Sequence, residues 1–428
     1  ASFGKGIAGG ELNYRNGRLN LYGTLNYSNG ANQIVERLST PYPGQIFDVT
    51  DDYKRIMKPL QYTAGLDFDI HKNAVLGIQW MSANANRKDE STDKIVVTKL
   101  PAAIIDSTMI TLGRATRNNS NNTLNLNYVW KIDSTGKTLT LNANRLWFNG
   151  SRTNDFNTSN YFGDGNTPTG IASHNTASGR QNITISTAQA DVQLPYAFAS
   201  LSLGGKLSFI SNTSDNRFGY FDQDGYHDDP TVSNGFEYRE QVQALYASAE
   251  KAIGKWSFQA GLRAEFTQTS GYAVSLGSTT TNRYFNLFPT AYIQFQPNAD
   301  NSWNLNYSKR INRPDYRSLD PFRAYATPYH YSQGNPFLLP SFNHNLEFAY
   351  AYKGRYSLTA FYQYERNHFA SVWMIDEIRN ITSGISLNFA DFVSYGTNAM
   401  ATWQPFGWWE AQVQLGVQQQ QLRSSVYA

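Results

Sequence analysis

Cysteine is absent from this 428-residue sequence, and charged residues are scarce. The absence of cysteine excludes a disulfide scaffold, a CxxC redox centre and a thiolate metal site. Asp, Glu, Lys and Arg together make up 16% of the chain, against about 25% in an average soluble domain. The net charge of +3 is too small at this length to indicate a nucleic-acid partner. Long apolar runs are missing too: the mean hydropathy is −0.50, and no run approaches the ~18 apolar residues of a membrane-spanning helix.

Aromatic residues, by contrast, are abundant. The sequence has 28 Tyr, 25 Phe and 9 Trp, or 14% of all residues. Disordered chains are poor in aromatics and rich in charge, so this chain is expected to fold. Its length suits two or three soluble domains or one barrel. The first residues, Ala1 to Lys5, lack the charged and apolar regions of a signal peptide. We therefore expect the sequence to begin inside a mature protein or inside a fragment of one.

Apolar and polar residues alternate strictly along many segments. In one of them, Leu124, Leu126 and Tyr128 share a face with Trp130. From Trp256 to Phe266 one face is wholly apolar and the other is polar. A period of two residues is the period of a β-strand. The same pattern recurs at residues 66–70, 201–209, 291–296, 303–307, 346–350 and 411–418, whereas helical spacing is hard to find.

The connections between these segments alternate in length. Short turn signals rich in Gly, Asn, Asp and Pro fall at residues 16–18, 71–73, 133–136, 195–196, 254–255, 297–301, 353–355 and 405–407. Long polar stretches lie between them, at residues 29–60, 82–121, 149–180, 211–238, 268–283, 309–342 and 366–393. Short periplasmic turns and long extracellular loops are typical of an antiparallel up-and-down transmembrane β-barrel. The sequence therefore predicts an all-β protein of this kind, with about 16 strands.

The tryptophans favour the same interpretation, because six of them lie beside the short turns: Trp130, Trp256, Trp303, Trp403, Trp408 and Trp409. Tryptophan at strand ends marks the membrane interface of a barrel. A soluble all-β protein, such as a propeller or tandem sandwiches, explains the alternation equally well. It does not explain the alternating lengths of the connections, and no blade-length repeat is present.

The polar phase of the alternation is expected to face the barrel lumen. It contains Glu11, Asn13, Arg15, Asp67, Asp69, Lys206, Arg263, Glu265, Glu347, Gln412 and Gln414. A charged side chain facing lipid at the midplane costs about 2–4 kcal/mol, which favours this orientation. Such a wall suits water and solute, or a folded plug held by hydrogen bonds. Pairing across the wall is the default role of these charges, and substrate contact is the alternative.

Several stretches resemble the barrel portion of TonB-dependent outer-membrane receptors, in particular the outer membrane protein beta-barrel family. The matching stretches are residues 9–23, which are similar to a first barrel hairpin, 244–265, which end in a G-L-R-x-E strand, 307–314 with R-x-x-R-P, 319–321 with L-x-P, and 334–340 with G-N-P-x-L-x-P. Ser341 departs from the family pattern, which has Glu after the last Pro. The resemblance spans about residues 6 to 417.

The resemblance implies an integral outer-membrane transporter of a Gram-negative bacterium. Such receptors have barrels of about 22 strands, together with an N-terminal plug domain and a TonB box, and neither the plug nor the box is present in this sequence. We therefore expect one barrel domain over residues 1–428 that is partial, with the plug and the last strands missing. The partners implied are outer-membrane lipid, the protein's own plug, the TonB–ExbB–ExbD system and a surface lipoprotein, with no nucleic acid.

In the implied mechanism, substrate binds at the outer loops and TonB pulls on the plug to open a path. A passive porin-like channel and a structural barrel within a larger envelope complex are the alternatives. The substrate, whether siderophore, glycan, peptide or vitamin, is not readable from the residues.

The sequence offers no catalytic constellation. The six histidines form no HExxH pattern, and a GxSxG elbow and a Walker loop are missing. We expect no enzyme activity and no cofactor. Four carboxylates, of Asp222, Asp224, Asp228 and Asp229, gather in a predicted extracellular loop. Closely spaced oxygen ligands suit calcium, but the EF-hand order is not kept, so a solvated acidic loop is the competing interpretation.

The segment from Asn312 to Ser341 is the best candidate for ligand contact. It contains Tyr316, Arg317, Phe322, Arg323, Tyr325, Tyr329, Tyr331 and Phe337. Aromatic and Arg side chains at a barrel rim suit planar or sugar-like ligands by stacking and acidic ligands by pairing. The alternative is that Pro314, Pro321, Pro336 and Pro340 stiffen a loop that packs on its neighbours.

Overall fold

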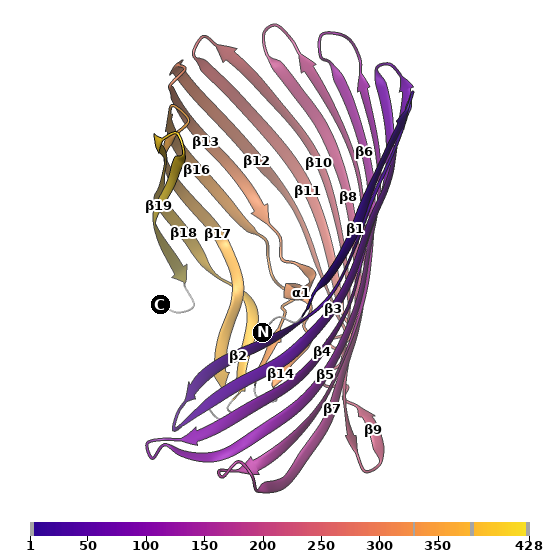
Figure 1. The fold of residues 1–428 in the computed structure, drawn as a ribbon, viewed down its shortest axis with the longest axis vertical. Helices are drawn as coiled ribbons and strands as arrows, with labels where there is room; N and C mark the ends of the chain where they lie inside the picture. Colours follow the sequence, from indigo (N-terminus) through magenta and orange to yellow (C-terminus); the bar gives the residue numbers. More distant parts are fainter. Residues whose placement is uncertain (1–3, 328–329, 377–380, 425–428) are drawn as a thin grey trace.

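Sixteen long strands form one antiparallel meander (Figure 1). The structure, a computed structural model, describes residues 4–327, 330–376 and 381–424. The long strands are β1 (Gly6–Asn16), β2 (Leu19–Tyr42), β3 (Gln45–His71), β4 (Ala74–Lys99), β5 (Ile104–Lys131), β6 (Thr138–Phe162), β7 (Pro168–Pro195), β8 (Ser200–Asp222), β10 (Asn234–Ile253), β11 (Trp256–Ala273), β12 (Ser278–Asn298), β13 (Asn301–Asn312), β16 (Ser341–Tyr352), β17 (Tyr356–Asp376), β18 (Ile381–Phe406) and β19 (Trp409–Ser424). The expectation of about 16 strands in an antiparallel meander is confirmed.

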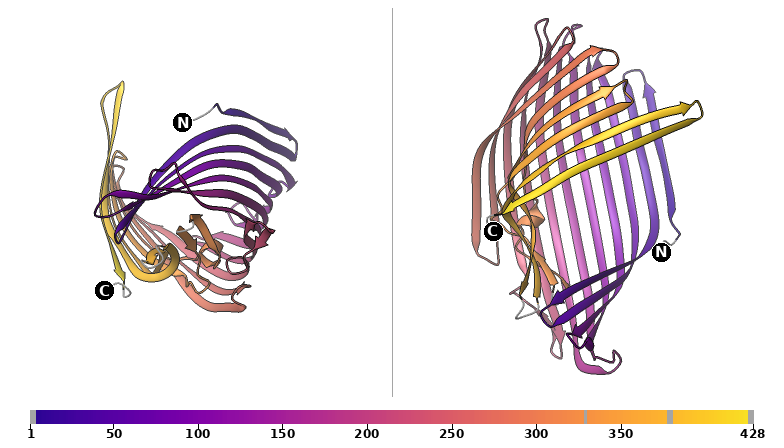
Figure 2. Two further views of the ribbon diagram at one scale, coloured as in Figure 1. Left: turned by 90° about the horizontal axis from the view of Figure 1, so that it is seen from below. Right: turned by 90° about the vertical axis from the view of Figure 1, so that its left-hand side faces the viewer.

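Four short elements complete the chain. Strand β9 (Gly225–Asp228) folds back on the end of β8. Helix α1 (Tyr316–Leu319) and the strands β14 (Arg323–Thr327) and β15 (His330–Gln333) belong to the connection between β13 and β16. The long sheet curls round, and this connection lies on its concave side (Figures 1 and 2). No helix in the described ranges is long and apolar enough to cross a membrane.

The two faces of the curled sheet differ in chemistry. One row of directly facing residues on the outer face is Tyr14, Leu21, Leu66, Ile78, Leu126, Ala143, Ala188 and Leu207, from eight successive strands. Leu245 and Leu262, on the same face, are 73% and 49% exposed, whereas Glu240 and Glu265 on the opposite face are each 7% exposed. An apolar band this large is far beyond what a protein surface in water tolerates. The outer face is therefore the lipid face.

Aromatic side chains border this band at the short turns. Trp256 stacks on Phe295 with ring centroids 4.3 Å apart, and Trp303 lies 4.2 Å from Tyr350. Trp403 meets Trp409 edge to face at 5.9 Å. The rings come from neighbouring strands, so they form a continuous aromatic edge of the kind found at a membrane interface.

The prediction of long extracellular loops is mostly wrong. Residues 29–60 belong to β2 and β3, which meet in a tight turn at residues 43–44, and β4 and β5 meet in a turn at residues 100–103. Beyond the membrane both faces of a strand meet water, so the alternation disappears although the hydrogen-bonded ladder continues. Among the described connections, the one long loop is that between β13 and β16.

The extended ends of the strands carry a small core of their own. Tyr42, Phe47, Ile95, Val97 and Met109 pack together there. The Tyr42 hydroxyl also makes a hydrogen bond of 2.5 Å with Thr382 of β18. This contact links the end of β2 to the start of β18, two strands that are far apart in the meander.

The lipid face gives a direct prediction. We expect Leu126→Arg, in the middle of the apolar band, to lower the free energy of unfolding by about 2–4 kcal/mol, because a cation then faces hydrocarbon. Asn144→Arg, a neighbouring substitution on the exposed concave face, is expected to change it by less than about 1 kcal/mol. Urea titration of the protein folded into lipid vesicles measures both. Equal costs for the two variants would contradict the assignment of the faces.

Candidate functional site

The connection between β13 and β16 is anchored to the concave wall by Arg313. Its guanidinium donates to Glu265 Oε2 at 2.7 Å and to Thr267 Oγ1 at 3.1 Å, and its Nε lies 3.7 Å from Glu240 Oε1. Both glutamates are buried in neighbouring strands, and Glu240 also accepts a hydrogen bond from Tyr238. Arg313 thus pairs with two buried carboxylates, and Arg263 gives Glu265 a second cation. Each carboxylate would otherwise carry a large desolvation cost.

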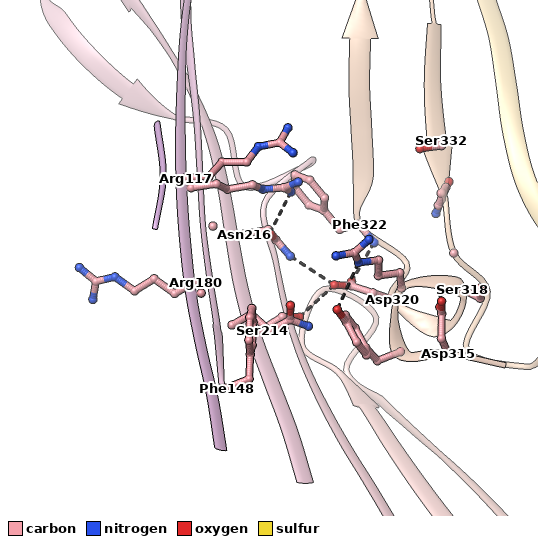
Figure 3. A pocket seen from close by; sticks show the side chains of 18 of the residues that line it. Arg117, Phe148, Arg180, Ser214, Asn216, Asp315, Ser318, Asp320, Phe322 and Ser332 are labelled. Atoms are coloured by element: carbon pink, nitrogen blue, oxygen red, sulfur yellow. Dashed lines mark hydrogen bonds between the residues drawn. The ribbon is translucent and has the colours of Figure 1, made fainter. Parts of the chain in front are cut away.

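A second anchor is the carboxylate of Asp320, just after α1. It accepts hydrogen bonds from Ser214 Oγ at 2.9 Å, Asn216 Nδ2 at 3.2 Å and Asn234 Nδ2 at 3.3 Å. The backbone N–H of Phe322 also donates to it, at 3.1 Å. The first three donors come from the wall strands β8 and β10, which Figure 3 shows in part. Burial raises the pKa of the Asp320 carboxyl, and the hydrogen bonds oppose this rise.

The G-N-P segment at residues 334–336 forms backbone hydrogen bonds with α1 and the residue that follows it. The N–H of Gly334 donates to the carbonyl of Asp320, and the N–H of Asn335 donates to the carbonyl of Ser318. A Cβ atom at position 334 would lie 2.4 Å from that Asp320 carbonyl oxygen, so only glycine fits here. Leu319 and Leu338 pack against Phe236 and Ala273 of the wall. The motifs around Arg313, at residues 319–321 and at residues 334–340 therefore build one structural unit that is fixed to the wall. We call it the pinned unit.

A cleft of about 450 Å³ opens between this unit and the wall strands β5 to β8. Arg152 crosses it: Nη2 donates to Asn216 Oδ1 at 3.2 Å, and the guanidinium lies 5.6 Å from the centre of the Phe322 ring. Arg117 of β5 faces Arg152 directly by strand register, and Figure 3 shows Arg180 pointing away from the cleft. Further polar lining residues are Asn119, Ser151, Gln181, Ser214, Ser332, Gln333, Ser371 and Ser386.

The structure brings some of the sequence-predicted ligand residues to this cleft. Tyr316, Arg317 and Phe322 line it. Arg323 instead lies 5.1 Å from the centre of the Tyr331 ring. The side chain of Tyr325 and the whole of Tyr329 lie outside the described residues. The expected position at the rim is corrected: the anchors fold the segment onto the concave side of the sheet.

The residues predicted to face the lumen share the concave polar face. Arg15 lies 3.8 Å from Asp69, and Asp67 accepts from Asn20 at 3.3 Å. Arg263 donates to Glu265 at 2.5 Å, and Glu347 accepts from Asn306 at 3.3 Å. By register, Glu11 faces Thr24, and Lys206 faces Gln189 and Ala244. Most of these charges therefore pair within the wall, and none of them lines the cleft.

Three of the four carboxylates considered for calcium, those of Asp222, Asp228 and Asp229, serve local turns. Asp222 accepts from the N–H of Asp224 at 2.8 Å and pairs with His227 at 2.9 Å. Asp229 accepts from the N–H of Thr231 at 2.9 Å, and Asp228 accepts weakly from Tyr226 at 3.4 Å. In the part of the chain that the structure describes, no group of three or more His, Asp or Glu side chains could hold a metal ion.

Sequence reasoning missed the arginines of the cleft. Arg117 and Arg152 lie in the polar stretches 82–121 and 149–180, where the alternation that separates inner from outer positions fades. Only the strand register brings them together, because Arg117 of β5 faces Arg152 of β6 directly. Asp320 was visible within the L-x-P motif, but its partners on β8 and β10 were not.

Comparisons with known proteins agree with this architecture. A family model described as "Outer membrane protein beta-barrel family" matches residues 130–427. No curated protein sequence matches the chain.

Solved structures resemble the fold at low sequence identity. The alcaligin outer membrane receptor FauA of Bordetella pertussis is 11% identical, with a TM-score of 0.51 over 98% of this chain and 61% of its own. The ferripyoverdine receptor of Pseudomonas aeruginosa is 12% identical, with a TM-score of 0.57 over 99% and 57%. The siderophore receptor PiuA of Acinetobacter baumannii is 12% identical, with a TM-score of 0.53 over 96% and 65%. The chain thus spans about three fifths of the length of these structures, and the likeness concerns the fold.

The Arg313 anchor can be tested by substitution. We expect Arg313→Ala to weaken docking of the α1 segment by about 3–5 kcal/mol, because Glu240 and Glu265 lose their shared cation. Hydrogen exchange of the Gly334 and Asn335 amides should then quicken, since both donate to the pinned unit. Arg366→Ala, an arginine outside this anchor, is the control and should leave both amides protected. Unchanged exchange in Arg313→Ala would contradict the role of the anchor.

The Asp320 anchor predicts a pH dependence. Its pKa is raised above 3.8 by burial in the docked segment. Between 3.8 and the raised value, the docked state holds a proton that the released state has lost, so docking weakens as the pH rises through the raised pKa. Hydrogen exchange at Gly334, corrected for intrinsic rates, should show this trend. Asp320→Asn should remove it, and a trend of the opposite sign would show that the hydrogen bonds outweigh burial.

Proposed function

The chain belongs to the outer membrane protein beta-barrel family, and from that premise we propose that it is the transporter barrel of a TonB-dependent receptor. It is an integral protein of the outer membrane of a Gram-negative bacterium. In the proposed function, the wall seats a plug domain and lets a scarce substrate pass when the TonB–ExbB–ExbD system moves the plug.

The observation that carries the proposal is a concave wall dense in hydrogen-bonding side chains behind a lipid-facing belt. Asn20 donates to Asp67, while Gln79 links the Tyr22 hydroxyl to Asn125. Tyr246 donates to Asp191 at 2.5 Å. Polar side chains held in fixed positions by one another suit a wall that must receive a folded domain and release part of it.

The pinned connection between β13 and β16 also favours gated rather than free passage. It occupies the concave side of the sheet, where an open pore would need space (Figure 2). Tyr316, Arg317 and Phe322 then present aromatic and cationic groups to the cleft. We assign these three residues to substrate contact. The charged residues of the wall are assigned to seating the plug: Glu11, Arg15, Asp67, Asp69, Lys206, Arg263, Glu265 and Glu347.

An epistasis experiment tests the proposal even while the substrate is unidentified. Solutes removed from the growth medium are measured by mass spectrometry for the wild type, a strain lacking this gene, a tonB strain and the double mutant. We expect the first two mutants to lose uptake of the same compound, and the double mutant to lose nothing further. Normal uptake of that compound in the tonB strain would contradict energised transport and favour a passive channel.

A further inference from the structure

Three arginines lie side by side on the concave wall. Arg87 of β4 faces Arg117 of β5, and Arg117 faces Arg152 of β6. The same line of facing residues continues through Gly179 and Asn216 to Asn234. Asn216 and Asn234 hold Asp320, so this line lies on the face that carries the pinned unit. We call Arg87, Arg117 and Arg152 the arginine row.

The arginine row has too little negative charge around it. The Asp89 carboxylate accepts a hydrogen bond from Arg87 Nε at 2.8 Å, and it also lies 3.4 Å from Arg55 Nε. Arg152 donates a hydrogen bond to the neutral amide of Asn216 and lies over the Phe322 ring; Asp320 acts on it as an opposite charge and Arg317 as a like charge. Within the described ranges, Arg117 forms no ion pair. Asp89 acts on it as an opposite charge, whereas three arginines, Arg87, Arg152 and Arg55, act on it as like charges. Like charges directly opposite in a sheet are destabilising, so this arrangement costs stability.

Gly179 makes room for the row. A Cβ atom at this position would lie 2.7 Å from Asn216 Oδ1 and 2.9 Å from Arg152 Nε. The bare backbone therefore lets Arg152 lie across β7 and reach Asn216 of β8. Without that space the guanidinium would be displaced from its place at the cleft. The absence of a side chain at Gly179 thus provides the space that the Arg152 side chain occupies.

The acidic groups of the cleft are already engaged. Asp320 accepts four hydrogen bonds from the wall and from its own segment. Asp315 accepts from the N–H of Ser318 at 2.8 Å. Arg317, on the opposite side of the cleft from the wall, adds a further cation. The cleft thus joins unpaired guanidinium groups to a set of hydroxyl and amide side chains.

We propose that the arginine row, with Arg117 at its centre, binds a multivalent oxyanion: a small molecule that carries two or more carboxylate or phosphate groups. Neighbouring strands are about 4.8 Å apart, so the first and third arginines start about 10 Å apart and serve separate anionic groups of one ligand. Guanidinium groups bind both oxyanions in a bidentate manner. The hydroxyl and amide groups of the cleft suit the neutral remainder of such a polar ligand.

This inference names the substrate class for the proposed transporter and rests on that function only for its biological role. Binding at the row needs neither TonB nor a membrane potential. Equilibrium binding to the purified protein therefore tests the row alone, whereas the uptake experiment tests transport. A protein that binds the probe but needs no TonB would overturn only the proposed function.

The experiment is isothermal titration of the detergent-purified protein with citrate and with tripolyphosphate, at constant ionic strength. We expect saturable binding of at least one probe and none of acetate, a monovalent carboxylate of the same chemistry. Arg117→Gln should weaken binding about tenfold or more, because it removes a charge-assisted bond. Arg180→Gln is the matched control: this lining arginine points away from the cleft (Figure 3), so it should change affinity less than twofold.

A second variant guards against loss of folding as the explanation. Gly179→Ala keeps every charge but displaces Arg152, and it should weaken binding several-fold while the protein still shows the heat-modifiable gel migration of a folded barrel. Preference for citrate or for tripolyphosphate identifies the ligand as a carboxylate or a phosphate. No saturable binding of either probe, wild-type affinity in Arg117→Gln, or an equal loss in Arg180→Gln would overturn the proposal.

Discussion

The hydrocarbon of the membrane is the constraint on which the rest of this structure depends. It offers no hydrogen-bond partner, so every backbone group at that depth must be paired in a ladder and every outward side chain must be apolar. The line from Tyr14 through Leu66 and Leu126 to Leu207 meets this requirement strand by strand. Since side chains alternate, the same requirement sends every second residue to the concave face, where polar groups gather.

The polar concave face then determines what the long connection can do. Buried carboxylates of β10 and β11 need a cation, and Arg313 supplies it from the connection itself. The wall amides of Asn216 and Asn234 need an acceptor, and Asp320 supplies that. The pinned unit and the wall therefore satisfy each other's charges and hydrogen-bonding groups, and the cleft lies between them. The arginine row lies at the edge of the cleft, and its positive charges are not balanced by these contacts.

Much of the barrel could be predicted from the sequence, because lipid imposes a period of two on residues such as Leu124, Leu126 and Tyr128. The extent of the strands could not, since β4 and β5 continue into water where neither face must be apolar. The cleft was harder still. Arg117 and Arg180 are the same residue type in similar polar stretches, and only register and facing separate the one at the cleft from the one that points away. The motifs around Arg313 and Gly334 were found, but their partners lie on strands that are distant in the sequence.

The most direct test of the account uses the absence of cysteine. Single substitutions to cysteine along β5, at each position from Leu124 to Trp130, allow a spin label to be attached at one site at a time in lipid vesicles. Collision rates with oxygen, which dissolves in lipid, and with a water-soluble nickel complex then report the surroundings. The account predicts that oxygen dominates at Leu124, Leu126, Tyr128 and Trp130, and the nickel complex at Asn125, Asn127 and Val129. A profile without this two-residue alternation would contradict it.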